Sequence, residues 1–181
     1  MTEQDIRDYS TAKGFHPQTL KRWLNWQADD ASALAHLALP LKINENHLRD
    51  LMDWLEEIAV RDGQSIRQIL ARRLISESAT DPRLGRSDRF KRIKEEIRRL
   101  RFPRLAAVED AIRARIVDLK LYPKIRLSVP SGLEGGRLRI EFAAATRTEF
   151  KQLSTRLLEA GDKQKLGEIF DFLAGEIDEI I

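Results

Sequence analysis

The sequence has no cysteine among its 181 residues, and this absence excludes several kinds of site. Without thiols a chain forms no disulfide, binds no metal or iron–sulfur cluster through cysteine and carries out no thiol catalysis. Apolar runs are short as well, and none approaches the roughly 18 residues of a membrane-spanning helix. The polar, acidic start, Met1-Thr2-Glu3-Gln4-Asp5, is unlike a secretory signal. We therefore expect a cytoplasmic protein that does not enter a membrane.

Short motifs of common enzyme sites are also missing. The chain has no HExxH, GxxxxGK(S/T) or GxGxxG segment, and its histidines, His16, His36 and His47, share no helical spacing. Two pairs of adjacent carboxylates, Glu56-Glu57 and Glu95-Glu96, would point about 100° apart on a helix, which suits a charged surface better than an acid–base couple. The sequence therefore predicts a protein that is not an enzyme and that needs no cofactor and no metal.

Charge is plentiful but unevenly distributed. Charged residues make up 34% of the chain and hydrophobic residues 42%, with a formal net charge of +3. Residues 81–104 hold ten Lys or Arg and four Asp or Glu, whereas residues 161–181 hold two Lys and six Asp or Glu. A foldable chain with a basic middle and an acidic end favours a polyanionic partner that meets its first or middle part.

The first part of the chain, residues 1–76, is predicted to be a compact helical domain. Helix caps and Gly or Pro breakers delimit a series of short segments, and apolar residues recur at three-four spacing along 45–61. These signals predict five helices at about 3–13, 17–26, 30–39, 45–61 and 65–76. Ser, Thr, Asp, Pro and Gly then concentrate in residues 77–88, where apolar residues nearly vanish. This change of composition predicts a linker.

Residues 89–181 are predicted to form a second domain, in the order helix, helix, strand, strand, helix, helix. Apolar and polar residues alternate along 125–129 and along 138–142, with a Gly-containing loop between, which predicts a β-hairpin. An isolated two-stranded sheet is marginally stable in water, and its outer strand keeps unpaired backbone groups. Pairing with the same edge of a second copy would remedy both defects, so we expect a homodimer through the hairpin 124–142. The predicted fold class is mainly α with a small α+β part.

The strongest local pattern, at residues 8–24, resembles the helix-turn-helix of bacterial regulators. Ser10 is small where the two helices would approach closely, and Gly14 can adopt the positive φ of the turn. Lys13 departs from the pattern, because that position is often apolar. The alternative is an ordinary helical hairpin that turns at Gly14.

If the pattern is a helix-turn-helix, five side chains remain on the surface of its second helix: His16, Gln18, Thr19, Lys21 and Arg22. Their types suit DNA, because Gln pairs with adenine, Arg with guanine or phosphate, and Lys with phosphate.

Two further basic surfaces are candidates for DNA contact. One is a helix that carries Arg89, Arg92 and Arg99. The other is the outer face of the hairpin, with Lys124, Arg126, Arg137 and Arg139. The alternative for both surfaces is a solvated face that binds no ligand.

The arrangement resembles the ParB family of chromosome- and plasmid-partition proteins. The resemblance rests on residues 8–24 and on 105–158, where a helix, the strand Lys124-Ile125-Arg126-Leu127-Ser128-Val129, a Gly-containing loop, the strand Arg137-Leu138-Arg139-Ile140-Glu141-Phe142 and a helix follow one another. It implies a DNA-binding domain, a domain that dimerises through its sheet, non-specific DNA contacts by the hairpin cations, and a partition ATPase as a partner on the nucleoid.

One part of that family has no match here, namely the N-terminal domain that binds CTP through a GERR-type arginine motif and a phosphate loop. The nearest string, Gly85-Arg86-Ser87-Asp88-Arg89, lies in and beside the predicted linker. The chain is then either a fragment or a protein that works without a nucleotide switch. The resulting hypothesis is a dimeric, sequence-specific DNA-binding protein for chromosome or plasmid partition. The alternatives are a transcriptional regulator, a protein-interaction adaptor with a solvated basic helix, and an RNA-binding protein that uses the hairpin.

Overall fold

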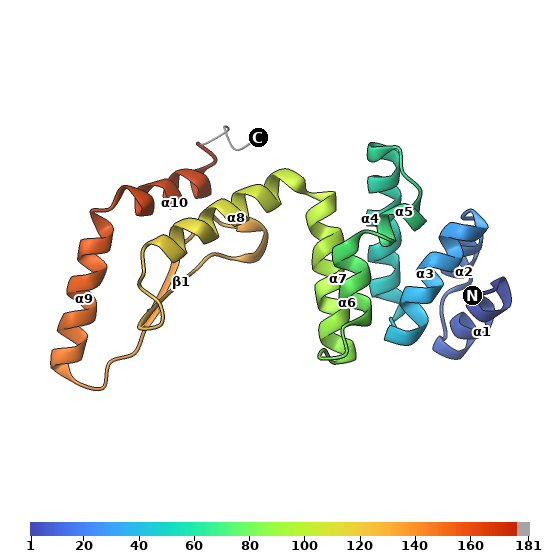
Figure 1. Cartoon of the computed structure of the whole chain (residues 1–181), viewed down its shortest axis with the longest axis horizontal. Coiled ribbons are helices and arrows are strands. Elements are labelled where there is room, and N and C mark those ends of the chain that lie inside the picture. The colour runs from blue at the N-terminus through green and yellow to red at the C-terminus, as the bar shows by residue number, and fades with distance from the viewer. Residues whose placement is uncertain (177–181) are drawn as a thin grey trace. The chain divides into compact units, whose positions relative to one another are not determined.

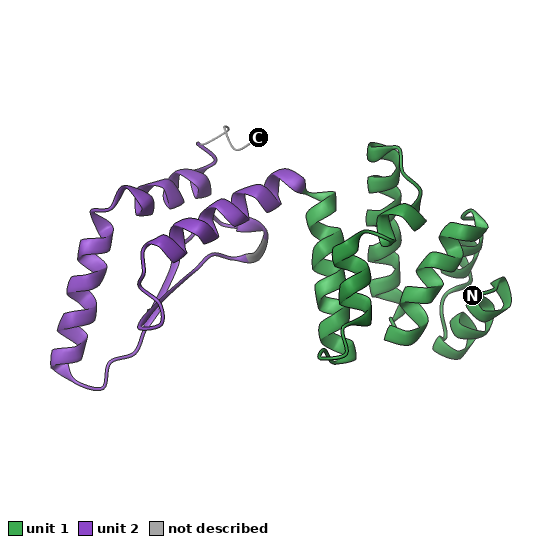
Figure 2. Cartoon of the chain, in the orientation of Figure 1, with its two compact units in different colours: residues 1–102 green, residues 103–181 purple. Residues whose placement is uncertain are grey.

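A computed structural model describes residues 1–176, which form helices and one small sheet (Figure 1). The chain divides into two compact units, residues 1–102 and 103–181 (Figure 2). Unit 1 consists of α1 (Glu3–Lys13), α2 (Pro17–Leu24), α3 (Ala28–Leu41), α4 (Glu45–Asp62), α5 (Ile66–Leu70), α6 (Arg73–Thr80) and α7 (Arg86–Arg101). The described part of unit 2 consists of α8 (Pro103–Asp118), β1 (Ile125–Ser128), a 3-10 helix η1 (Ser131–Leu133), β2 (Arg139–Phe142), α9 (Arg147–Gly161) and α10 (Gln164–Ala174). The predicted fold class, mainly α with a small α+β part, is confirmed.

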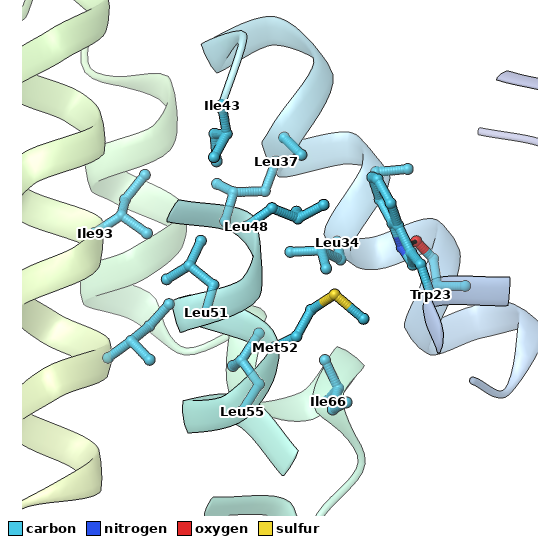
Figure 3. Packing of buried hydrophobic residues seen from close by; sticks show 14 of the residues in the cluster. Trp23, Leu34, Leu37, Ile43, Leu48, Leu51, Met52, Leu55, Ile66 and Ile93 are labelled. Carbon is cyan, nitrogen blue, oxygen red and sulfur yellow. Dashed lines mark hydrogen bonds between the residues drawn. The ribbon is translucent and has the colours of Figure 1, made fainter. Parts of the chain in front are cut away.

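Helix α4 is central to the core of unit 1, because an apolar stripe runs along it. Leu48, Leu51 and Leu55 of this stripe have no exposed surface. Figure 3 shows Leu51 on the side of α4 that faces Ile93 of α7, and Met52 on the side that faces α3. Each fully buried leucine contributes about 1.5–3 kcal/mol to folding. Unit 1 therefore has a continuous core, which joins α7 to the N-terminal helices.

The boundary between the units lies later than the composition predicted. Helix α6 extends to Thr80, and the predicted helix 65–76 is two helices, α5 and α6. Helix α7 belongs to unit 1, since Ile93 and Ile97 have no exposed surface and share one cluster with α4. The composition of residues 77–88 is typical of a loop. A loop between two helices of one core has the same composition as a linker between two cores, so the sequence did not distinguish them.

The predicted hairpin is confirmed as an antiparallel pair of strands. Ile125 lies opposite Phe142, and Leu127 lies opposite Ile140. The two strands are unequally covered, because Ile125 and Leu127 of β1 are buried whereas Ile140 of β2 is 40% exposed. Within the described residues, no third strand pairs with either of them.

The core of unit 2 lies between α8, α10 and β1. Ile112 of α8, Ile125 of β1 and Ile169 of α10 are almost fully buried and belong to one cluster. The order of elements is helix, strand, strand, helix, helix, because the first helix predicted for this domain is α7 of unit 1. Unit 2 thus covers one strand of its sheet well and leaves the other largely exposed.

Candidate nucleic-acid interface

The turn between α1 and α2 has the geometry that its glycine predicts. Gly14 adopts φ 67° and ψ 36°, a left-handed conformation that is costly for residues with a Cβ atom. The N–H of Phe15 donates to the C=O of Ser10 over 2.9 Å, which closes the end of α1. Ser10 is buried, and Pro17 occupies the first turn of α2. Residues 8–24 are therefore two helices joined by a tight turn, an arrangement that a helix-turn-helix and an ordinary helical hairpin share.

Glu45, the first residue of α4, holds the beginning of α2. Its carboxylate accepts a hydrogen bond from the Thr19 hydroxyl at 2.6 Å and another from the His16 N–H at 2.9 Å. The hydrogen bond from Thr19, followed by that from His16, lowers the pKa of Glu45. Thr19 itself is only 7% exposed. The structure therefore uses Thr19 to attach α2 to α4 and removes it from the surface where the sequence placed it.

Arg22 holds the other end of α2 to the same helix. Its guanidinium lies 2.6 Å from an Asp53 oxygen and 2.6 Å from a Glu56 oxygen. The indole N–H of Trp26 also donates to Glu56, at 2.7 Å. The hydrogen bond to Glu56 is the main cause of a raised pKa of the Arg22 side chain. Because two carboxylates already neutralise its charge, Arg22 has little attraction left for a phosphate.

The other three predicted contact residues, His16, Gln18 and Lys21, are exposed. The Nδ1 atom of His16 accepts a hydrogen bond from the N–H of Gln18 at 3.2 Å, so His16 caps the start of α2. A neutral histidine that accepts at Nδ1 carries its proton on Nε2, where it can donate outward. Within the described residues, the amide of Gln18 and the amine of Lys21 have no partner. The start of α2 thus presents three unoccupied donors.

Lys13, which departs from the helix-turn-helix pattern, is exposed at the end of α1. Its Nζ atom lies 3.4 Å from the carbonyl oxygen of Lys42, in the turn between α3 and α4. The contact beside the turn is made instead by Tyr9 and Phe15, whose rings meet edge to face with centroids 5.6 Å apart. A lysine at this position is therefore compatible with the close approach of α1 and α2.

A hollow of about 340 Å³ opens where α2 meets α4. It is lined by His16, Gln18, Thr19, Arg22 and Arg49. The sequence did not identify Arg49 as a candidate. The apolar stripe of α4 predicts that Arg49 faces outward, because Leu48 and Met52 are turned to the core. Nothing local in the sequence indicates that this outer face borders α2.

The basic helix α7 uses many of its cations within the protein. Lys94 pairs with Asp50 at 2.7 Å, and Arg101 pairs with Glu57 at 2.6 Å, which attaches α7 to α4. Among the predicted contact residues, Arg89 donates its Nε–H to the carbonyl of Leu84 at 3.0 Å, Arg99 is half-buried, and Arg92 is exposed. The run of cations is therefore partly a means of packing α7, and Arg92 is its most accessible predicted contact.

The outer face of the hairpin is less basic than the sequence predicted. Arg126 lies opposite Glu141 across the sheet, and Arg139 pairs with the same glutamate at 2.6 Å. Lys124 lies 3.6 Å from Glu149 of α9. Arg137 is exposed, but it precedes β2 and therefore does not belong to the row of side chains on the outer face of that strand. The four cations are present, but carboxylates interrupt the basic plate.

The charge of unit 1 changes along its sequence. Residues 1–64 hold seven Lys or Arg and eleven Asp or Glu, whereas residues 65–102 hold twelve and five. The surface near α2 therefore offers a polyanion a few exposed donors and not a strong local excess of positive charge. Most of the long-range attraction in unit 1 would come from α5, α6 and α7.

Residues 1–176 contain neither a cluster of metal ligands nor a membrane-spanning helix. No group of three His, Asp or Glu side chains lies close enough there to hold a metal ion. None of the described helices combines the length and the apolar character needed to cross a membrane. No known protein family, curated protein or solved structure matches this chain significantly.

Proposed function

We propose that this protein binds double-stranded DNA as a homodimer and inserts α2 into the major groove. The observation that carries the proposal is the combination of a firmly attached helix and unoccupied donors on it. Glu45 holds one end of α2 and the Arg22 ion pairs hold the other, while Gln18 and Lys21 are exposed and have no partner among residues 1–176. A recognition helix needs this arrangement, because base and phosphate contacts require side chains that the scaffold positions.

The proposed dimer rests on unit 2. Strand β2 has an unpaired outer edge within the described residues, and Ile140 on it is 40% exposed. Phe142 and Phe150 lie side by side, with ring centroids 5.9 Å apart, and Phe150 is 54% exposed. An exposed sheet edge beside apolar side chains is suited to pairing with the same edge of a second copy. Two copies of α2 would then meet two half-sites of one DNA site.

Chromosome or plasmid partition is the process that we propose for this DNA binding. The support is the ParB-like order of a helix-turn-helix pattern followed by a β-hairpin domain. In that role the protein would act on the nucleoid in the cytoplasm, with a partition ATPase as a partner. Transcriptional regulation is the alternative role for the same DNA-binding surface.

Fluorescence anisotropy with a labelled random-sequence DNA duplex tests the proposed binding. We expect binding at micromolar protein in low salt, which weakens steeply as salt is added because counterions are released from the phosphates. Lys21→Glu should weaken it about tenfold or more, whereas Lys163→Glu, the same charge change in unit 2, should weaken it much less. The absence of salt-sensitive binding by the wild type would refute the proposal.

A protein-interaction adaptor is the second candidate, and one observation favours it. A groove of about 890 Å³ runs along α6 and α7, and its lining includes Leu74, Glu77, Arg92 and Glu95. Leu74 is 53% exposed there, beside side chains of both signs, which is a surface typical of contacts with another protein. This function predicts that Lys21→Glu changes nothing, whereas Leu74→Asp abolishes recovery of a partner by cross-linking.

A further inference from the structure

Two arginines border the hollow between α2 and α4, and their surroundings differ. Arg22 of α2 is bound to Asp53 and Glu56, each at 2.6 Å. Arg49 of α4 is exposed, and within the described residues its guanidinium has no hydrogen-bond or ion-pair partner. One arginine is therefore committed to the protein, and the other retains all five N–H donors for a ligand.

The position of Arg49 limits what it can reach. It lies on α4 and borders the hollow together with His16 and Gln18 at the start of α2. Glu45, one turn earlier on the same helix, interacts with the charge of Arg49, but its carboxylate already accepts hydrogen bonds from the Thr19 hydroxyl and the His16 N–H. A helix that flanks a groove-bound helix reaches the sugar–phosphate backbone more readily than the base edges. The exposed guanidinium thus has the charge and the position to bind a phosphate beside α2.

We propose that Arg49 contacts a backbone phosphate of the bound DNA, and that Arg22 is a positioning residue that stays on its two carboxylates. This inference rests on the proposed function, because it assigns residues within the same DNA-binding surface. It reverses the assignment that sequence position alone favours, in which the arginine of the second helix touches DNA. Moving Arg22 to a phosphate would break two ion pairs with Asp53 and Glu56 to form one. Arg49 would break no hydrogen bond or ion pair within residues 1–176, and would weaken only its charge interaction with Glu45.

The salt dependence of DNA binding tests the role of Arg49. Loss of one phosphate contact lowers the slope of log affinity against log salt by about 0.9. We expect Arg49→Ala to lower the slope by this amount and to weaken binding about tenfold at low salt, with an unchanged melting temperature. Arg49→Lys should retain most of the slope, because it keeps the charge. Lys163→Ala, which removes an exposed cation from unit 2, is the control and should leave the slope unchanged. An Arg49→Ala protein with the slope of the wild type would overturn the assignment.

The Arg22→Met variant tests the positioning role. We expect its melting temperature to fall by several degrees and its DNA affinity to fall with it, while the salt slope stays equal to that of the wild type. Arg22→Lys should not restore the melting temperature, since a lysine cannot bridge Asp53 and Glu56 as a planar guanidinium does. A loss of salt slope in Arg22→Met without a loss of melting temperature would overturn this role.

The two proposals fail in different ways. If the wild type shows no salt-sensitive binding, the proposed function and the Arg49 contact both fail. The melting temperature of Arg22→Met still tests the attachment of α2 in that case. If the wild type binds and Arg49→Ala behaves like it, only the assignment of Arg49 fails.

Discussion

Unit 1 and unit 2 bury their apolar residues to different extents. In the described residues, the core cluster of unit 1 contains nineteen buried hydrophobic residues, whereas that of unit 2 contains nine. Unit 2 also exposes large apolar side chains on its sheet and on α9, among them Ile140, Phe150 and Leu158. A unit with a small core and an unpaired strand edge is stabilised when a second copy covers that edge, because association favours the folded state. We therefore expect unit 1 to be stable as a monomer and the stability of unit 2 to depend on protein concentration.

The largest expected effect is on the core of unit 1. Leu51→Ala should lower the free energy of unfolding by about 2–5 kcal/mol, because it removes a fully buried side chain between α4 and α7. Urea unfolding followed by tryptophan fluorescence reports on unit 1, since all three tryptophans lie in it. Its midpoint should not change with protein concentration. A midpoint that rises with concentration would contradict the difference between the units.

A polar substitution on β2 should dissociate the proposed dimer. Ile140→Asp would place a carboxylate at the sheet edge, and we expect the dimer dissociation constant to rise by about 100-fold, equivalent to about 2.7 kcal/mol. Sedimentation equilibrium of the full chain measures this change. The matched control is Val117→Asp, which alters an exposed apolar residue of α8 and should leave the dimer intact. Equal dissociation in both variants, or a monomeric wild type, would argue against the hairpin interface.

Two glycines allow a comparison of backbone effects between the units. Gly14→Ala should destabilise unit 1 by about 1–2 kcal/mol, because Gly14 has φ 67° and an alanine is strained there, even though its Cβ would meet no more distant part of the described chain within 4 Å. Gly167 lies inside α10, and a Cβ there would meet no residue outside its own helix within 4 Å among those that the structure describes. Gly167→Ala should therefore stabilise unit 2 by about 0.5–1 kcal/mol. Thermal unfolding by circular dichroism measures both. A Gly14→Ala protein as stable as the wild type would show that the left-handed conformation of the turn is unimportant.

The smallest expected effect is a pH dependence of unit 1. Hydrogen bonds from Thr19 and His16 lower the pKa of Glu45, so the folded protein binds fewer protons than the unfolded chain near that pKa. The stabilising contribution is therefore present above the pKa of an unfolded glutamate, about 4.3, and is lost as the pH falls through the lowered value. Glu45→Gln should make the urea midpoint less dependent on pH between 3 and 6. Glu134→Gln in the loop of unit 2 is the control, and an identical pH profile for wild type and Glu45→Gln would refute the prediction.

Local features of the fold were predictable from the sequence, and the grouping of helices was not. The predicted helix at 3–13, the turn at Gly14 and the hairpin all agree with the structure. The assignment of α7 to the second domain was wrong, because a basic outer face concealed the two isoleucines, Ile93 and Ile97, that pack against unit 1. Periodicity reveals which face of a helix is apolar, but not which other helix covers it.

In the candidate site, too, local features were predictable from the sequence and long-range contacts were not. The turn at Gly14 and the start of α2 were predictable, since turn formation and helix initiation depend on neighbours in the sequence. The hydrogen-bond and ion-pair partners of each side chain were not predictable. Glu45, the partner of Thr19, lies 26 residues beyond it, and Glu56, a partner of Arg22, lies 34 residues beyond it. The sequence by itself determined two helices around Gly14 and a polar face on the second. Only the tertiary structure decided that α4 engages Thr19 and Arg22 and leaves Gln18, Lys21 and Arg49 exposed, because ion pairs form between side chains that folding brings together.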